Sequence, residues 1–138
     1  MKGNDMKPFK YLSPTTVEQA IDYYGQHSET AKFVAGGTDV IVKVKEGWME
    51  PDYLISLKKI EEMNTLHKNE TTGELSIGAL VTHAILEKSL MIQNEYPIIY
   101  DAVSNIGSLQ VRNMGTIGGN LINAVPSADG AIPLIALD

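Results

Sequence analysis

The sequence predicts an α+β protein of two lobes. Short apolar runs and helical patterns alternate between residues 10 and 57, in the order strand, helix, strand, helix, strand. After residue 58 the pattern changes to a hairpin followed by several helices. Residues 33–40 and 112–121 are both rich in glycine and lie far apart in the chain. We therefore expect a first α/β lobe over residues 1–58 and a second α+β lobe over residues 59–138.

The first lobe contains a clear signal for a helix start. Thr15 and Glu18 have the spacing of a capping box, in which each side chain satisfies a backbone amide at the start of a helix. Apolar residues then fall on one helical face up to Gly25, which we expect to end the helix. The expected elements are a strand at 10–12, a helix ending at Gly25, a strand at 32–35, a helix capped by Thr38 and a strand at 53–57.

In the second lobe the hairpin signal comes first. Two short apolar runs flank a polar turn that contains Gly73, which can adopt positive φ. Helical patterns follow, and their first residues are good cap or N1 residues. The expected elements are strands at 66–69 and 75–78, a helix capped by Thr82, and a helix opened by Pro97 with Ile98, Ala102, Ile106 and Leu109 on one face.

Composition excludes several classes of function. The net charge is −6, and the eleven Lys and Arg are scattered, so nucleic acid is not a partner we expect. The chain has no cysteine, which excludes disulfides and iron–sulfur clusters held by this chain alone. The three histidines lack metal-ligand spacing, and we expect no metal site. No apolar run has the length of a membrane span or of a signal peptide, so we expect a cytoplasmic location.

The first glycine-rich stretch has the form strand, paired glycines, helix start. Glycine lets a ligand approach the main chain, and the first amides of a helix lack intrahelical partners. Together with the helix dipole these features form an anion site suited to a phosphate or diphosphate, although a plain strand-to-helix turn has the same pattern. The stretch matches neither the Rossmann fingerprint nor the P-loop. Its residues are Phe33, Val34, Ala35, Gly36, Gly37, Thr38, Asp39 and Val40.

The second stretch places three glycines within five residues, and we expect it to expose further amides to a diphosphate. Asp129 follows it and precedes an expected helix start near Pro133. Asp129 is therefore either an N-cap or an acceptor for a ribose hydroxyl. From Ala102 onward only Arg112, Asp129 and Asp138 are charged, so we expect this segment to be buried against a ligand, another surface or the lobe's own core. The residues of the stretch proposed for the site are Thr116, Ile117, Gly118, Gly119 and Asn120.

These motifs, taken in order, resemble the flavin domain of molybdenum hydroxylases, the xanthine dehydrogenase and carbon monoxide dehydrogenase flavoprotein family. The resemblance is carried by VAGGTD from Val34, by RNMGTIGGN from Arg112, by AxPxAD ending at Asp129 and by PLIAL ending at Leu137. It extends from about residue 7 to the end. It implies a two-lobed FAD-binding fold of the vanillyl-alcohol-oxidase (PCMH) type. It also implies that residues 33–40 and 116–120 contact the FAD diphosphate and that Asp129 holds a ribose hydroxyl.

The resemblance also implies a function and partners. Such a subunit passes electrons from [2Fe-2S] clusters on a small partner chain through FAD to NAD or another acceptor, and a large partner chain binds the molybdopterin. The flavin performs the redox chemistry, so we assign no catalytic residue to this chain. The absence of cysteine is consistent with clusters on a partner chain.

Relatives in the family continue well beyond the segment that ends at Leu137, so we expect an incomplete second lobe and no activity in the isolated chain. Two alternatives remain at this stage: a structural or interaction subunit that keeps the scaffold without flavin, and a phosphate-binding module unrelated to flavin. The resemblance implies that the substrate of the parent complex is set on another chain.

Overall fold

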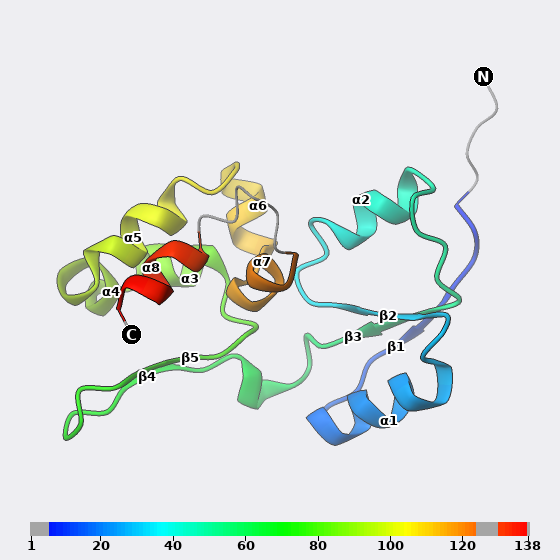
Figure 1. Ribbon diagram of the computed structural model, residues 1–138, viewed down its shortest axis with the longest axis horizontal. Helices are drawn as coiled ribbons and strands as arrows, with labels where there is room; N and C mark the ends of the chain where they lie inside the picture. Colours follow the sequence, from blue (N-terminus) through cyan, green and yellow to red (C-terminus); the bar gives the residue numbers. More distant parts are fainter. Residues whose placement is uncertain (1–5, 124–129, 138) are drawn as a thin grey trace. The chain divides into compact units, whose positions relative to one another are not determined.

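The computed structural model describes residues 6–123 and 130–137 (Figure 1). The chain divides into two compact units, Met1–Glu62 and Met63–Asp138. The structure combines helices with a parallel sheet in the first unit and an antiparallel hairpin in the second, and this is the α+β class that the sequence predicts.

The first unit is a three-stranded parallel sheet between two helices. The strand order is β1-β3-β2, so the last strand lies in the centre, and its Leu54 and Ile55 are fully buried. Helix α1 lies on one face of the sheet and α2 on the other (Figure 1), which explains why the central strand is apolar on both faces. The elements are β1 (Lys10–Leu12), α1 (Val17–His27), β2 (Ala31–Val34), α2 (Val40–Lys45) and β3 (Tyr53–Ser56).

Helix α1 starts one residue later than the capping-box pattern predicts. Its N-cap is Thr16, whose hydroxyl accepts a hydrogen bond from the amide of Gln19 at 3.2 Å. The side chain of Gln19 accepts in turn from the amide of Thr15 at 3.0 Å. The capping logic is therefore correct but the residues are shifted, because Thr16 and Gln19 have the same spacing as Thr15 and Glu18.

The prediction that Gly25 ends α1 is wrong. The helix continues to His27, because the residues around Gly25 pack on the sheet. Tyr24 stacks on Phe33 with ring centroids 4.9 Å apart, and His27 stacks on Tyr53 at 3.8 Å. Two aromatic contacts offset the weak helix propensity of one glycine.

The second unit opens with the predicted hairpin and continues as a group of short helices. The hairpin strands pair antiparallel, with Gly73 at φ +76° in the turn. Thr82 caps α3 as predicted, and its hydroxyl accepts from the amide of Ile85 at 3.3 Å. The elements are a 3₁₀ turn (Glu61–Met63) at the junction, then β4 (Leu66–Lys68), β5 (Leu75–Ile77), α3 (His83–Lys88), α4 (Leu90–Glu95), α5 (Pro97–Ser104), α6 (Leu109–Met114), α7 (Ile117–Asn123) and α8 (Ala131–Ala136).

The core of the second unit is formed by one face of α5 together with α3, α4 and α7. Pro97 opens α5 as predicted, but the buried residues of this helix are Ile99 and Val103 rather than Ile98 and Ala102. The helix ends at Ser104, so the predicted face could not extend to Leu109. The core cluster consists of Val81, Leu86, Ile92, Ile99, Val103 and Ile117.

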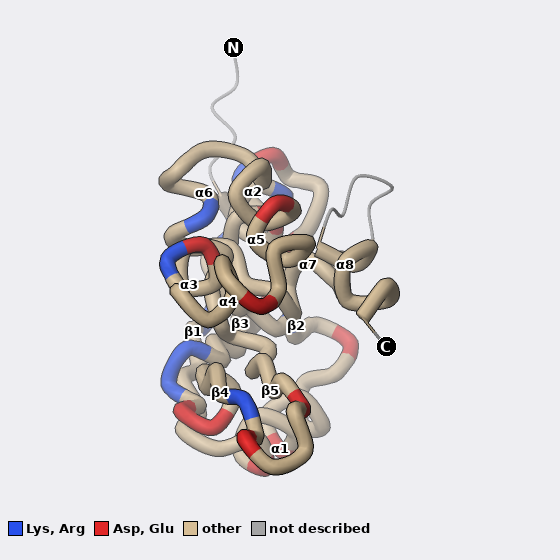
Figure 2. The backbone as a smooth tube through the Cα atoms, turned by 90° about the vertical axis from the view of Figure 1, so that its left-hand side faces the viewer, with Lys and Arg blue, Asp and Glu red and all other residues tan. Residues whose placement is uncertain are grey.

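The charge-poor end of the chain is only partly buried in its own unit, because Ile117 belongs to the core but other apolar residues of α7 and α8 are exposed. Ile122 of α7 is 86% exposed and Ile135 of α8 is 77% exposed. Figure 2 shows that neither helix carries a charged residue. Within the residues that the structure describes, no helix has both the length and the apolar character that crossing a membrane requires.

The capping geometry of α1 makes a prediction about stability. Thr16→Ala removes the acceptor for the Gln19 amide, and we expect it to lower the free energy of unfolding by about 1 kcal/mol. Thr15→Ala, the matched control, removes only an exposed hydroxyl contact at 3.3 Å and is expected to cost clearly less. Urea denaturation of both variants measures the difference. Equal losses would contradict the assignment of Thr16 as the cap.

Candidate functional site

The first glycine stretch connects the end of β2 to the start of α2. Strands β2 and β3 are parallel, with Val34 opposite Ser56, so their carboxyl ends lie at the same edge of the sheet. In open sheets of this kind, ligands bind outside the carboxyl ends of the strands. The loop between Val34 and Val40 lies at this edge.

The loop leaves backbone donors free. In the described part of the chain the amides of Gly36, Gly37, Thr38 and Val40 donate to no protein acceptor. Gly37 adopts φ +84°, a conformation that side chains other than glycine rarely take. A Cβ at Gly37 would lie 3.2 Å from Cγ1 of Ile41. Helix α2 has only six residues, so the free amides, rather than a long helix dipole, are the groups available to an anion.

The side chains of this stretch point in different directions. Phe33 and Val34 alternate across the strand, and Phe33 stacks on Tyr24 of α1. Val34 is buried, and its Cγ2 lies 3.4 Å from the position that a Cβ of Gly37 would take. Thr38 donates its hydroxyl hydrogen bond to the carboxylate of Asp39 at 3.1 Å. The stretch therefore presents backbone rather than side-chain groups at the loop.

Ser56 is a polar residue at this edge that the sequence patterns do not reveal. It ends the central strand β3, is 1% exposed, and its Oγ has no hydrogen-bond partner. A buried hydroxyl without a partner costs about 1–3 kcal/mol. Nothing in the sequence separates this serine from the apolar residues of the same strand, because burial is a property of the folded chain.

The second glycine stretch is fixed to the segment before α3 by backbone hydrogen bonds. The amide of Gly118 donates to the carbonyl of Ala79 at 2.9 Å, and the amide of Ile117 donates to Val81 at 3.0 Å. The amide of His83 donates to the carbonyl of Gly115 at 3.1 Å. Thr82 and Thr116 form an antiparallel bridge within this ladder. Segments more than thirty residues apart are thus held edge to edge.

The prediction that this stretch exposes free amides is wrong. The amide of Gly115 donates to Val111 at 2.6 Å, and that of Gly119 donates to the hydroxyl of Thr116 at 3.1 Å. The amide of Asn120 donates to the carbonyl of Thr116 at 3.0 Å. With Ile117 and Gly118 in the ladder, all four amides at the start of α7 are paired within the protein.

Gly118 instead permits a close approach of two backbones. A Cβ at this position would lie 2.7 Å from both the carbonyl oxygen and the Cβ of Ala79, closer than real side chains come. The ladder therefore requires glycine at position 118 for steric reasons. Sequence reasoning identified the position but gave the wrong physical cause.

Two polar side chains of the stretch form hydrogen bonds with nearby backbone amides. Thr116 is buried and acts as the N-cap of α7, and Asn120 accepts a hydrogen bond from the amide of Gly130 through Oδ1 at 3.2 Å. The amide nitrogen of the Asn120 side chain is a donor that this contact does not use. Asp129 lies outside the described residues.

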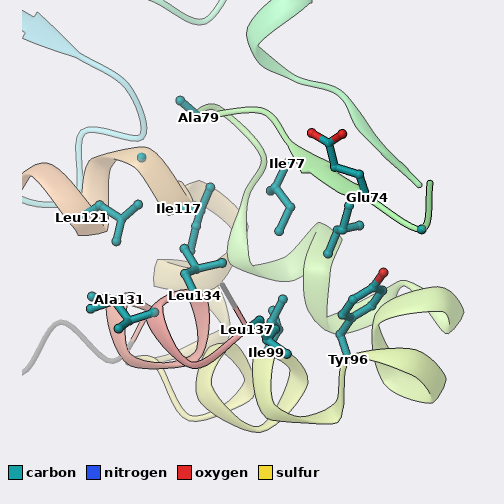
Figure 3. A pocket seen from close by; sticks show the side chains of 14 residues that line it. Glu74, Ile77, Ala79, Tyr96, Ile99, Ile117, Leu121, Ala131, Leu134 and Leu137 are labelled. Atoms are coloured by element: carbon teal, nitrogen blue, oxygen red, sulfur yellow. The ribbon is translucent and has the colours of Figure 1, made fainter. Parts of the chain in front are cut away.

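Ile117, Gly118 and Leu121 line an open groove in the second unit (Figure 3), with a volume of about 900 Å³. The other walls come from β5, α5 and α8, and most of their side chains are apolar. Such a surface suits apolar atoms and gives no support for a diphosphate. The labelled groove residues are Glu74, Ile77, Ala79, Tyr96, Ile99, Ile117, Leu121, Ala131, Leu134 and Leu137.

A polar cluster behind the second stretch was also missed by the sequence reasoning. His83 is 2% exposed, and its Nδ1 has no hydrogen-bond partner. Arg112 of α6 forms an ion pair with Glu87 of α3 at 2.9 Å and donates to the carbonyls of Ile106 and Gly107. Burial first, and the Arg112 guanidinium second, lower the pKa of the His83 imidazole below its ordinary value.

The sequence that forms this fold and these two stretches matches a known protein family. Residues 7–138 match the family described as the FAD binding domain in molybdopterin dehydrogenase. The chain belongs to this family, and FAD is the cofactor of the domain.

The comparisons with individual proteins agree. The chain is 36% identical over 134 residues to the nicotinate dehydrogenase FAD-subunit of Eubacterium barkeri, covering 96% of this chain and 45% of that protein. It is 32% identical over 130 residues to the carbon monoxide dehydrogenase medium chain of Hydrogenophaga pseudoflava, covering 94% and 45%. The chain thus spans about half the length of the curated relatives it matches.

Solved structures give the same fold. The carbon monoxide dehydrogenase of Hydrogenophaga pseudoflava that lacks the Mo-pyranopterin moiety superposes with a TM-score of 0.78 at 33% identity, over 83% of this chain and 40% of that one. The reconstituted enzyme from Oligotropha carboxidovorans gives 0.79 at 31% identity, over 84% and 40%. These similarities place the chain in the two-lobed FAD-binding fold.

The packing role of Gly118 can be tested. We expect Gly118→Ala to lower the free energy of unfolding by about 1–3 kcal/mol, because the new Cβ collides with the backbone of Ala79. Gly25→Ala is the matched control, since nothing lies within 4 Å of its Cβ position and it lies inside α1. That change should raise stability by about 0.5–1 kcal/mol. A neutral Gly118→Ala in urea denaturation would contradict the steric argument.

Proposed function

We propose that this chain is the diphosphate-binding part of an FAD-dependent electron-transfer subunit in a molybdenum hydroxylase complex. The observation that carries the proposal is the loop after β2, in which four amides are free and Gly37 holds a positive φ. Those donors fit an anionic diphosphate, because the loop lies at the carboxyl edge of the sheet. The residues proposed for this contact are Phe33, Val34, Ala35, Gly36, Gly37, Thr38, Asp39 and Val40.

The second stretch contributes in a different way from the first. The amides of residues 117–120 are paired, so residues 116–120 are proposed to contact the cofactor through the glycine surface and the side chain of Asn120. Ile117 and Gly118 also form part of the apolar groove wall, which suits uncharged parts of a dinucleotide. Asp129 is proposed to hold a ribose hydroxyl, since a carboxylate accepts hydrogen bonds from a diol and repels phosphate.

The proposed reaction places the redox chemistry on the cofactor. Bound FAD would take electrons from [2Fe-2S] clusters on a small partner chain and deliver them to NAD or another acceptor, while a large partner chain binds molybdopterin. The residues of this chain would bind and orient the cofactor, and we assign them no acid or base role. A cytoplasmic location and inactivity of the isolated chain belong to the same proposal.

A structural subunit without flavin is the second candidate. The observation that favours it is the pairing of every amide at the start of α7, which removes half of the expected anion site. The two candidates differ in one measurable property, the flavin content of the complex that contains this chain.

A pair of glycine variants distinguishes the flavin-binding subunit from the structural subunit. Gly37→Ala places a side chain at φ +84° beside Ile41, and we expect flavin affinity in the purified complex to fall about tenfold or more. Gly47→Ala imposes similar strain at φ +74° at an exposed position just after α2, outside the proposed contacts, and should leave flavin affinity unchanged. Flavin absorbance and fluorescence titration give both values. A colourless wild-type complex, or equal losses in the two variants, would exclude flavin binding at this loop.

A further inference from the structure

We propose that His83 is a positioning residue that holds the second cofactor-binding stretch in place, and that it does so only as the neutral imidazole. The inference rests on the proposed function for the meaning of that stretch, but its physical basis is the local structure. His83 has no role in the sequence motifs and does not belong to the proposed cofactor contacts.

His83 lies at the junction of three helices in the backbone ladder. It is the first residue of α3, and its amide donates to the carbonyl of Gly115 at the point where α6 ends. The adjacent Thr82 forms the bridge with Thr116, which caps α7. Movement of His83 therefore displaces both the end of α6 and the start of α7.

The imidazole ring of His83 packs against Gly115. A Cβ at Gly115 would lie 3.2 Å from Cδ2 and 3.5 Å from Nε2 of His83, so the imidazole occupies the space beside that glycine. The ring is 2% exposed and cannot turn out to solvent without opening this contact. The ring and the backbone of His83 thus fix the same residue, Gly115, from two sides.

The charges around the His83 ring disfavour its protonated form. The buried Nδ1 has no partner that could share a proton's charge. Among the helices that pack on α3, Arg112 of α6 places a positive charge near the ring. Glu87, on α3 itself, is already paired with Arg112, Asp101 of α5 is exposed, and Glu95 of α4 pairs with Lys68. A protonated His83 would be a buried cation beside another cation, which is costly.

The contribution of His83 to stability therefore depends on pH. The folded-state pKa of His83 is lowered relative to its unfolded value, so His83 favours the folded form fully above about pH 6.5. That stability is lost as the pH falls from about 6.5 towards the folded pKa. Acid should loosen the ladder and release residues 115–118 before it affects the hairpin.

Amide hydrogen exchange of the 138-residue chain, followed by NMR, tests this directly. In the wild type we expect protection of the Gly118 and Ile117 amides, corrected for the intrinsic rate, to fall about tenfold between about pH 7 and about pH 5. The amide of Asn69, which donates to Glu74 in the hairpin, is the internal reference and should keep its protection. Unchanged protection of Gly118 over this range would overturn the inference.

Two substitutions separate charge from shape. His83→Phe and His83→Gln cannot titrate, and in each we expect the acid-dependent loss at Gly118 to disappear, even where overall stability is lower. His67→Phe removes an exposed histidine of β4 and should retain the wild-type pH dependence. If both His83 variants keep that dependence, the inference fails. If neither variant folds, an NMR titration of the His83 ring in the wild-type chain provides the test. Protonation of the ring while the Gly118 amide keeps its protection would overturn the inference.

The cofactor arm of the experiment is independent of the exchange arm. FAD affinity of the intact complex should fall with pH in the wild type and remain constant in His83→Gln. Acid loosening at Gly118 without any flavin binding at neutral pH would leave His83 as a positioning residue and refute the proposed function. If FAD affinity stays constant with pH while the Gly118 amide loses protection in acid, the link between the ladder and the cofactor is refuted.

Discussion

The backbone ladder between residues 79–83 and 115–118 is the constraint on which the second unit depends. It joins two segments that are distant in sequence, and it determines where α3, α6 and α7 begin or end. The ladder requires a distance between Ala79 and Gly118 that excludes any side chain at the second position. Core residues such as Val81 and Ile117 come from the ladder itself, so hydrogen bonding and apolar burial reinforce each other there.

The two glycine stretches resemble each other in sequence but differ in physical role. In the first, a positive φ at Gly37 turns the backbone so that amides remain free at the edge of the sheet. In the second, the lack of a Cβ at Gly118 allows one backbone to lie against another. The amides there donate hydrogen bonds within the protein. Glycine supports both uses, and the sequence pattern alone does not distinguish them. The first stretch offers backbone donors at a sheet edge, whereas the second joins two segments of its own unit.

Local signals predicted the order of the elements well, because caps and turns act over a few residues. The β-α-β-α-β order of the first unit, the hairpin around Gly73 and the cap at Thr82 follow from such signals. Errors arose where tertiary contacts decide: aromatic stacking carries α1 past Gly25, and packing against α3 and α4 buries Ile99 instead of Ile98. The burial of the polar residues Ser56 and His83 could not be predicted from the sequence pattern, because it depends on the whole fold.

Ser56 of the first unit and His83 of the second share one unfavourable feature. Among the described residues they hold the two buried side-chain atoms that lack a hydrogen-bond partner. Ser56 lies opposite Val34, whose side chain contacts the Gly37 turn, and His83 packs against Gly115. Each orphaned group costs about 1–3 kcal/mol, and an apolar residue of similar size would avoid that cost. A scaffold selected for stability alone would have no reason to keep a polar atom behind both glycine stretches. Their position beside the glycine stretches therefore supports the proposal that each stretch has a role beyond maintaining the fold.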